Sequence, residues 1–157
     1  KGVEAHFMRN AAIMPVCSPL LLESGDLQTP EDLTKHTLIH VSSRSQEWNM
    51  LFQQSGLRWS RDQKSLTFSN TSLALNAAME GLGVALSDSE LIEREVQYGQ
   101  LAQPFDMVLQ SARAFYLVYS NKRQPTYGMA SFRDWLLAQM EASREAKAEA
   151  DKLDAET

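Results

Sequence analysis

The sequence predicts an α/β fold with a mostly parallel sheet. Short runs typical of buried strands, such as residues 37–41 and 83–86, alternate along the chain with patterns typical of helices. Most of the helical patterns begin at a residue that caps helices well and end at a glycine. Strands that alternate with helices are typical of parallel sheets, so the order of the patterns indicates this fold class.

The first third of the chain predicts two strands and a short helix. Residues 3–8 and 13–17 have the composition of strands, and Pro15 places the second strand at a sheet edge or at a crossing between layers. The short helix is expected to begin at Pro30, because proline is favoured at the first helical position, and to end near Lys35.

The next strand is expected at residues 37–41, where the sequence TLIHV is typical of a buried strand. Ser43 and Gln46 have the spacing of a capping box, which predicts a helix that begins there and ends at Gly56. An apolar stripe supports this helix and consists of Trp48, Leu51 and Phe52.

The middle of the chain repeats this pattern. A strand at residues 66–68 is followed by the capping residues 69–71 and by a helix that Gly81 ends. A further strand is expected at 83–86.

The last part of the chain predicts two helices and one more strand. Ser87 and Glu90 form a second capping box and predict a helix after the strand 83–86. Residues 114–119 are almost wholly apolar, as in a strand that is buried on both faces. Apolar residues at helical spacing predict a C-terminal helix around Trp135.

The composition is that of a globular domain. The chain has 157 residues, of which 43% are hydrophobic, enough for one domain that needs no disulfide or metal to hold its core. The single cysteine, Cys17, excludes an internal disulfide and fits a reducing compartment. No apolar run approaches the roughly 20 residues that span a bilayer, so we expect a cytoplasmic protein without membrane contact.

The net charge of −5 argues against a nucleic-acid-binding surface on this domain, because neutralising phosphates requires clustered Lys and Arg. Residues 141–157 contribute −3 of this charge, from six acidic and three basic residues. This segment has almost nothing to bury, and we expect residues 143–157 to form a frayed or disordered tail.

The sequence contains no recognisable catalytic, metal or cofactor motif. The three histidines (His6, His36 and His40) lack the spacing of a zinc site, and no phosphate-binding glycine loop or nucleophile elbow is present. His40 is interpreted as a hydrogen-bonded core residue and Cys17 as an inert buried thiol, rather than as reactive groups. We therefore expect no enzyme activity, no metal and no cofactor.

Polar residues follow three of the predicted strands where each strand gives way to a helix. The carboxyl ends of strands and the amino ends of helices line the ligand crevice of open α/β sheets, and free N–H groups there favour a carboxylate or phosphate. For any single residue, capping of a helix is the more common role. The three sets are Ser42, Ser43 and Arg44; Ser69, Asn70 and Thr71; and Ser87 and Asp88.

Several short segments occur in an order that is more specific than any one of them. They are PVCSP (15–19), LQTPEDL (27–33), HTLIH (36–40), FSNTSLAL (68–75), GLGVAL (81–86), GQL (99–101), AFYLV (114–118) and FRDWL (132–136). This series, which covers residues 2–142, resembles the effector-binding domain of LysR-type transcriptional regulators. It is most similar to the subgroup that contains the glycine-cleavage activator and the β-lactamase regulator.

The resemblance implies a two-lobed fold like that of type 2 periplasmic binding proteins. Residues 1–17 would be a remnant of the first lobe and one crossing strand, 18–110 the second lobe, and 111–142 the return crossing strand and C-terminal helix. Most of the first lobe and an N-terminal winged helix-turn-helix would be missing, so we expect a fragment that reaches DNA only through the missing domain.

The resemblance also implies a small-molecule effector between the lobes and self-association into a dimer or tetramer. Effector contacts would come from the three sets of polar residues, with Phe115 near the hinge. Arg44 would bind a carboxylate through two parallel hydrogen bonds; the alternative interpretation is a solvated arginine in a first helical turn. Two alternatives stay open: a periplasmic-type solute-binding protein, and a small α/β enzyme with an unrecognised site.

Overall fold

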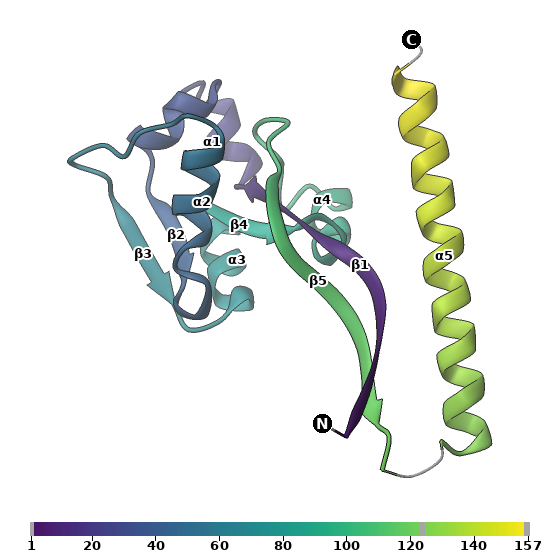
Figure 1. Cartoon of the computed structure of the whole chain (residues 1–157). Helices are drawn as coiled ribbons and strands as arrows, with labels where there is room; N and C mark the ends of the chain where they lie inside the picture. Colours follow the sequence, from purple (N-terminus) through teal and green to yellow (C-terminus); the bar gives the residue numbers. More distant parts are fainter. Residues whose placement is uncertain (1, 123–124, 156–157) are drawn as a thin grey trace. The chain divides into compact units, whose positions relative to one another are not determined.

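The computed structural model describes residues 2–122 and 125–155, with side chains placed at all of these except 110–112 and 147–155. Five strands form one sheet in the order β3-β2-β4-β1-β5 (Figure 1). In chain order the elements are β1 (Val3–Val16), α1 (Pro19–Glu23), η1 (Pro30–Lys35), β2 (Leu38–Val41), η2 (Ser42–Arg44), α2 (Glu47–Gln54), β3 (Ser65–Phe68), α3 (Thr71–Met79), β4 (Val84–Asp88), η3 (Ser89–Leu91), α4 (Glu93–Gln97), β5 (Leu109–Ser120) and α5 (Tyr127–Ala155), where η denotes a 3-10 helix.

The chain divides into two compact units. The larger unit is Ala12–Ser111, and the smaller unit combines Lys1–Ala11 with Ala112–Thr157. Strands β1 and β5 therefore contribute residues to both units. No helix among the described residues is both long enough and apolar enough to cross a bilayer.

The larger unit contains the parallel part of the sheet. β2 pairs in parallel with β3 on one side and with β4 on the other. β1 pairs antiparallel with β4, and Pro15 lies opposite Leu86. Because β1 lies between β4 and β5, it is not an edge strand of the sheet, which leaves the crossing that was the other expectation for Pro15, and the mostly parallel sheet also contains antiparallel pairing.

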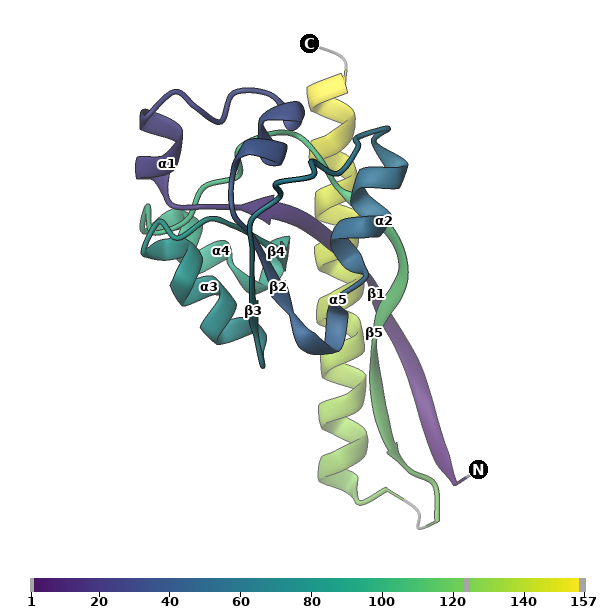
Figure 2. The same cartoon turned by 90° about the vertical axis from the view of Figure 1, so that its left-hand side faces the viewer.

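Helices cover both faces of this sheet (Figure 2). The predicted stripe of α2 is buried: Trp48 packs edge to face against Phe52, and its indole N–H donates to the Ile39 carbonyl at 3.0 Å. On the other face, alanines of α3 pack into a cluster with Ile39, Val41 and Ala85 of the strands. Small side chains let this helix approach the sheet closely.

Two predicted capping boxes are wrong. Residues 42–44 form the 3-10 turn η2, and α2 begins only at Glu47, so Ser43 does not cap it. Ser87 lies inside β4, where it pairs with Met14 of β1, and the residue that caps η3 is Asp88. In both places the chain makes a tighter 3-10 turn before the α-helix begins.

The smaller unit consists of the outer halves of β1 and β5 together with α5. The Phe7 and Tyr116 rings pack edge to face at 5.8 Å, and Arg133 of α5 donates to the Tyr119 hydroxyl at 3.2 Å. Because β5 exposes Tyr116 and Val118 here, the prediction of a strand buried on both faces is wrong.

The C-terminal helix is longer than the sequence pattern predicted. The apolar residues Met129, Phe132, Trp135, Leu136 and Met140 lie in its N-terminal half, and the helical backbone continues through Ala155. Most of the segment 143–157 that was expected to be frayed or disordered thus has helical backbone, and its stability in solution stays a prediction.

Gly83 precedes β4 at a point of very close approach. The Thr37 carbonyl accepts a hydrogen bond from the Val84 N–H at 2.9 Å, and a Cβ atom at position 83 would overlap that carbonyl oxygen. The start of the parallel pairing of β2 with β4 therefore requires glycine.

We predict that Gly83→Ala destabilises the chain by about 3 kcal/mol or more, because either the Cβ clash or the strand pairing must give way. Gly56 is a matched control: its φ is +69° and an added Cβ meets open space, so Gly56→Ala should cost only about 1 kcal/mol of left-handed strain. Urea unfolding of the two variants tests this. Equal losses would contradict the assigned role of Gly83.

Candidate functional site

The carboxyl ends of β2 and β3 bring two of the predicted polar sets together. Val41 pairs with Phe68 at the last position of the ladder, so residues 42–44 and 69–71 emerge side by side. The Arg44 guanidinium donates from Nη2 to the Thr71 hydroxyl at 2.8 Å. We call these six residues the rim.

Arg44 is held in place from two sides. Its side chain is only 14% exposed, and its Nη1 lies 3.5 Å from Oε2 of Glu47, which is buried in the first turn of α2. It is therefore neither a solvated surface arginine nor an unpartnered charge. A guanidinium has five N–H donors, so these contacts leave donors for a further acceptor.

The amino end of α3 completes the rim. The Asn70 side chain caps the helix and accepts a hydrogen bond from the Leu73 N–H at 3.0 Å, as the sequence predicted. Ser42, Ser43 and Ser69 are exposed beside it. The rim thus combines hydroxyl groups, one guanidinium and a helix amino terminus, which together suit an anionic group.

The structure does not bring Ser87 and Asp88 into the rim as exposed groups. Both side chains are buried in β4. The Asp88 carboxylate accepts hydrogen bonds from the Ala12 N–H at 3.0 Å and from the Glu90 N–H at 3.2 Å, and the Ser87 hydroxyl is buried without a partner in the described residues. Asp88 therefore fixes the position of β1 and caps η3.

Phe115 lies in the smaller unit. The residue is 37% exposed, and the Arg9 guanidinium lies 4.2 Å from its ring centroid. The sequence did not predict this cation–π contact, because it joins two strands that are more than a hundred residues apart in the chain.

The other titratable candidates have structural roles. Cys17 is fully buried, as interpreted from the sequence, and burial raises the pKa of its thiol to about 11, which disfavours the reactive thiolate. His40 stacks on Trp59, and burial lowers the pKa of its imidazole against a smaller opposing effect of a hydrogen bond with the Ser45 backbone. No cluster of three or more possible metal ligands occurs among the residues that the structure describes.

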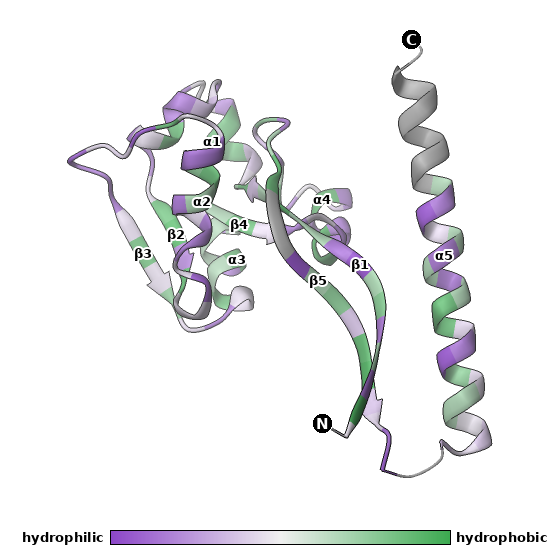
Figure 3. Cartoon of the chain, viewed as in Figure 1, coloured by the Kyte–Doolittle hydropathy of each residue, from purple (hydrophilic) through white to green (hydrophobic). Residues whose placement is uncertain are grey.

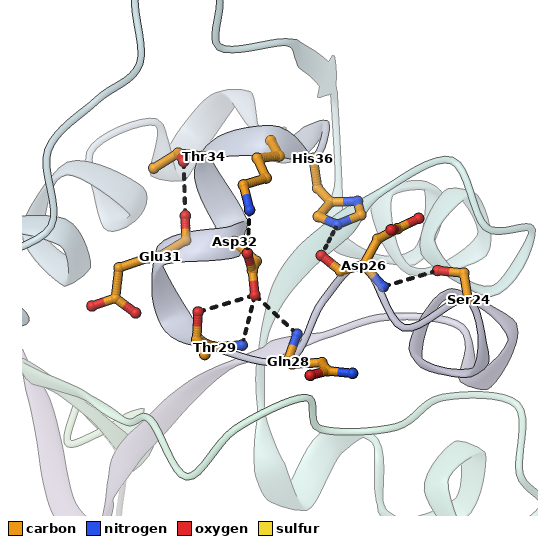
Figure 4. Close-up of polar contacts among 9 residues, drawn as sticks. Ser24, Asp26, Gln28, Thr29, Glu31, Asp32, Thr34 and His36 are labelled. Atoms are coloured by element: carbon orange, nitrogen blue, oxygen red, sulfur yellow. Dashed lines mark hydrogen bonds and ion pairs between the residues drawn. The ribbon is translucent and has the colours of Figure 1, made fainter.

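A polar hollow of about 530 Å³ lies beside η1. Its polar groups bond mainly to one another, so we assign it a structural role rather than a binding role. Its centre is the Asp32 carboxylate, which accepts hydrogen bonds from the Gln28 N–H, from both the N–H and the hydroxyl of Thr29, and from Lys35 at 2.6 Å (Figure 4). These contacts, first of all the one with Lys35 and then those with Thr29 and Gln28, lower the pKa of Asp32 well below its usual range. Because they fill its acceptor positions, Asp32 organises the start of η1.

Comparison with known proteins identifies the kind of domain to which this rim belongs. A sequence profile of the LysR substrate binding domain matches residues 1–141. The chain is 42% identical over 134 residues to the glycine cleavage system transcriptional activator of Escherichia coli K12, and 32% identical over 137 residues to the HTH-type transcriptional activator AmpR of Pseudomonas aeruginosa. These matches cover 85% and 87% of this chain but only 44% and 45% of the relatives.

Solved structures of effector domains have the same fold as this chain. The effector domain of AmpR from Pseudomonas aeruginosa superposes with a TM-score of 0.79 at 29% identity, covering 94% of this chain and 69% of that domain. The AmpR effector-binding domain from Citrobacter freundii gives 0.77 at 26% identity, covering 89% and 68%. The α/β chain is thus of the periplasmic-binding-protein-like class, and it belongs to the LysR substrate binding domain family of transcriptional regulators. It spans less than half the length of these curated relatives.

We predict that Asp32→Asn lowers the melting temperature of the chain at neutral pH. The depressed pKa means that the ionised carboxylate stabilises the fold above the ordinary aspartate pKa of about 4, and this contribution is lost as the pH falls and the folded carboxylate is protonated. The difference between wild type and variant should therefore shrink below pH 4 in thermal unfolding.

Thr34→Ala is the control for this pH dependence. It removes a hydrogen bond of the same helix, from the Thr34 hydroxyl to the Glu31 carbonyl at 2.7 Å, which involves no titrating group. Its effect should not change with pH in this range. A pH-independent loss in Asp32→Asn would contradict the assigned role of the carboxylate.

Proposed function

We propose that the rim binds a small effector with a carboxylate or similar anionic group, such as an amino acid. The observation that carries this proposal is the Arg44 guanidinium, held at the carboxyl end of the parallel strands by Thr71 and Glu47. An arginine fixed in this way loses little conformational freedom when it binds a planar acceptor.

The other predicted contact residues stay part of the proposal, some as direct contacts of the effector and some as supporting residues. Ser42, Ser43 and Ser69 are exposed hydroxyls that suit the polar part of an effector, and Asn70 and Thr71 shape the start of α3. Burial of Ser87 and Asp88 favours a supporting role for them. Phe115 belongs to the smaller unit, and its predicted contact with the effector stays a proposal.

For the whole protein we infer a transcriptional regulator whose effector domain controls DNA binding by a separate winged helix-turn-helix. Support comes from the relatives, which are transcriptional activators and in part carry the designation HTH-type. The same support favours a cytoplasmic protein that is not an enzyme, and it favours a regulator over the alternatives of a solute-binding protein or a small α/β enzyme.

The lobe assignment is part of this proposal. Residues 18–110 would be the second lobe, 1–17 and 111–142 would hold the crossing strands and C-terminal helix, and 143–157 a tail outside the lobes. The larger unit, Ala12–Ser111, has its own core, whereas the smaller unit leaves an apolar surface exposed. A two-stranded ribbon is marginal by itself, which suits a lobe that further polypeptide completes.

We predict that Arg44→Ala in a full-length regulator carrying this chain weakens effector binding at least about tenfold and abolishes the transcriptional response, because a charge-assisted contact is lost. A thermal-shift screen with amino acids and other small carboxylic acids supplies the ligand, since binding raises the melting temperature. Unchanged effector affinity and response in Arg44→Ala would refute the assignment.

Arg94→Ala is the matched control. Arg94 of α4 lies on another element and its guanidinium contacts only the Tyr98 ring among the described residues. This variant should bind effector as the wild type does. Circular dichroism of both variants separates loss of binding from loss of fold.

We also predict that the isolated chain self-associates, because Tyr116, Val118, Phe132 and Trp135 of the smaller unit are all more than half exposed. Sedimentation velocity should show oligomers, and Val118→Asp combined with Trp135→Lys should shift the chain towards monomer. A wild-type chain that sediments as a clean monomer at high concentration would contradict this expectation.

A further inference from the structure

The loop between α2 and β3 carries an unusual concentration of positive charge. Arg58, Arg61 and Lys64 lie within seven residues with one acid, Asp62, which gives this loop a charge of +2 in a chain of net charge −5. All four side chains are exposed, and none of them forms an ion pair with another described residue. We call residues 57–64 the basic loop.

Hydrogen bonds anchor the C-terminal part of the basic loop. The Gln63 side chain donates to the His36 carbonyl at 2.7 Å, and the Leu38 N–H donates to the Lys64 carbonyl at 2.9 Å. Within the loop, the Gln63 N–H donates to the Ser60 carbonyl at 3.3 Å. A loop that is ordered before binding loses less entropy when a partner binds.

An aromatic side chain lies among these cations. The Trp59 ring packs against Phe52 at 4.7 Å and against His40 at 6.3 Å, yet 40% of the residue remains exposed. Leu66, on the neighbouring edge strand β3, is 39% exposed. Tryptophan and arginine are the residues most enriched at the energetic centres of protein–protein interfaces.

The basic loop and the rim lie at opposite ends of strands β2 and β3. The loop leads into Ser65, which pairs with Leu38 at the amino ends of β2 and β3, whereas the rim follows their carboxyl ends. Figure 1 shows the loop projecting beyond the amino end of β3, and Figure 3 shows that the loop is largely hydrophilic. A partner bound here would not occupy the proposed effector site.

We propose that the basic loop is a docking surface for an acidic protein segment that carries an apolar side chain. The acidic groups would pair with Arg58, Arg61 and Lys64, and the apolar side chain would pack on Trp59. Duplex DNA fits less well, because three cations neutralise few phosphates, the rest of the chain is acidic, and a duplex backbone offers no apolar group to Trp59. The proposal concerns a different surface from the rim and does not depend on the effector.

Nuclear magnetic resonance of the whole 157-residue chain tests this proposal with a synthetic 12-residue peptide of Asp, Glu and Leu as the probe. At low ionic strength the peptide should shift the indole N–H signal of Trp59 and leave that of Trp48, which is buried and hydrogen-bonded, unchanged. Arg61→Glu should weaken binding about fivefold, and Asp62→Lys should strengthen it. Trp59→Ala should also weaken it.

Arg94→Glu is the matched control, because it changes the net charge as much as Arg61→Glu does but lies on α4. Its affinity for the peptide should stay within about twofold of wild type. The proposal is overturned if Arg94→Glu weakens binding as much as Arg61→Glu, if Trp59 does not respond, or if a 12-base-pair duplex binds as tightly as the peptide and is equally sensitive to Arg61→Glu.

Discussion

The parallel pairing of β2 with β3 and β4 determines where the polar groups of the larger unit lie. Because the strands run in one direction, the segments after β2 and β3 meet at the carboxyl ends of these strands, where Arg44 contacts Thr71. The loop before β3 lies at their amino ends. The pairing with β4 begins at Val84, whose N–H reaches the Thr37 carbonyl only because position 83 has no side chain. One ladder therefore separates two surfaces of different chemistry.

The sequence predicted those parts of the fold that local interactions decide. Asn70 caps α3, and a glycine follows α2, as expected, because capping depends on residues within one turn. Ser87 was misassigned because a distant segment decides its structure: β1 pairs with it and extends β4 by two residues beyond the predicted end. No pattern near Ser87 records that pairing.

The candidate site shows the same division. The rule that strand ends converge predicted that residues 42–44 and 69–71 would meet, and they do. Which partner holds Arg44 was not predictable, because the hydrogen bond to Thr71 joins residues 27 positions apart and the contact with Glu47 depends on where α2 begins. The basic loop was missed altogether, since Trp59 lies in a loop without periodicity and its packing on Phe52 is a tertiary contact.

Asp88 shows why a polar residue at a strand end need not bind a ligand. Its carboxylate is buried at the end of β4, and it accepts a hydrogen bond from Ala12, the residue at which β1 enters the larger unit. A buried carboxylate requires such partners, since burial without them would cost several kcal/mol, about as much as a small domain's margin of stability. The Asp88 carboxylate therefore serves to fix β1. The exposed groups of the rim do not need internal partners in the same way, because water can solvate them. Burial, rather than residue type or place in the sequence, separates the residues that hold the sheet from those that are available to an effector.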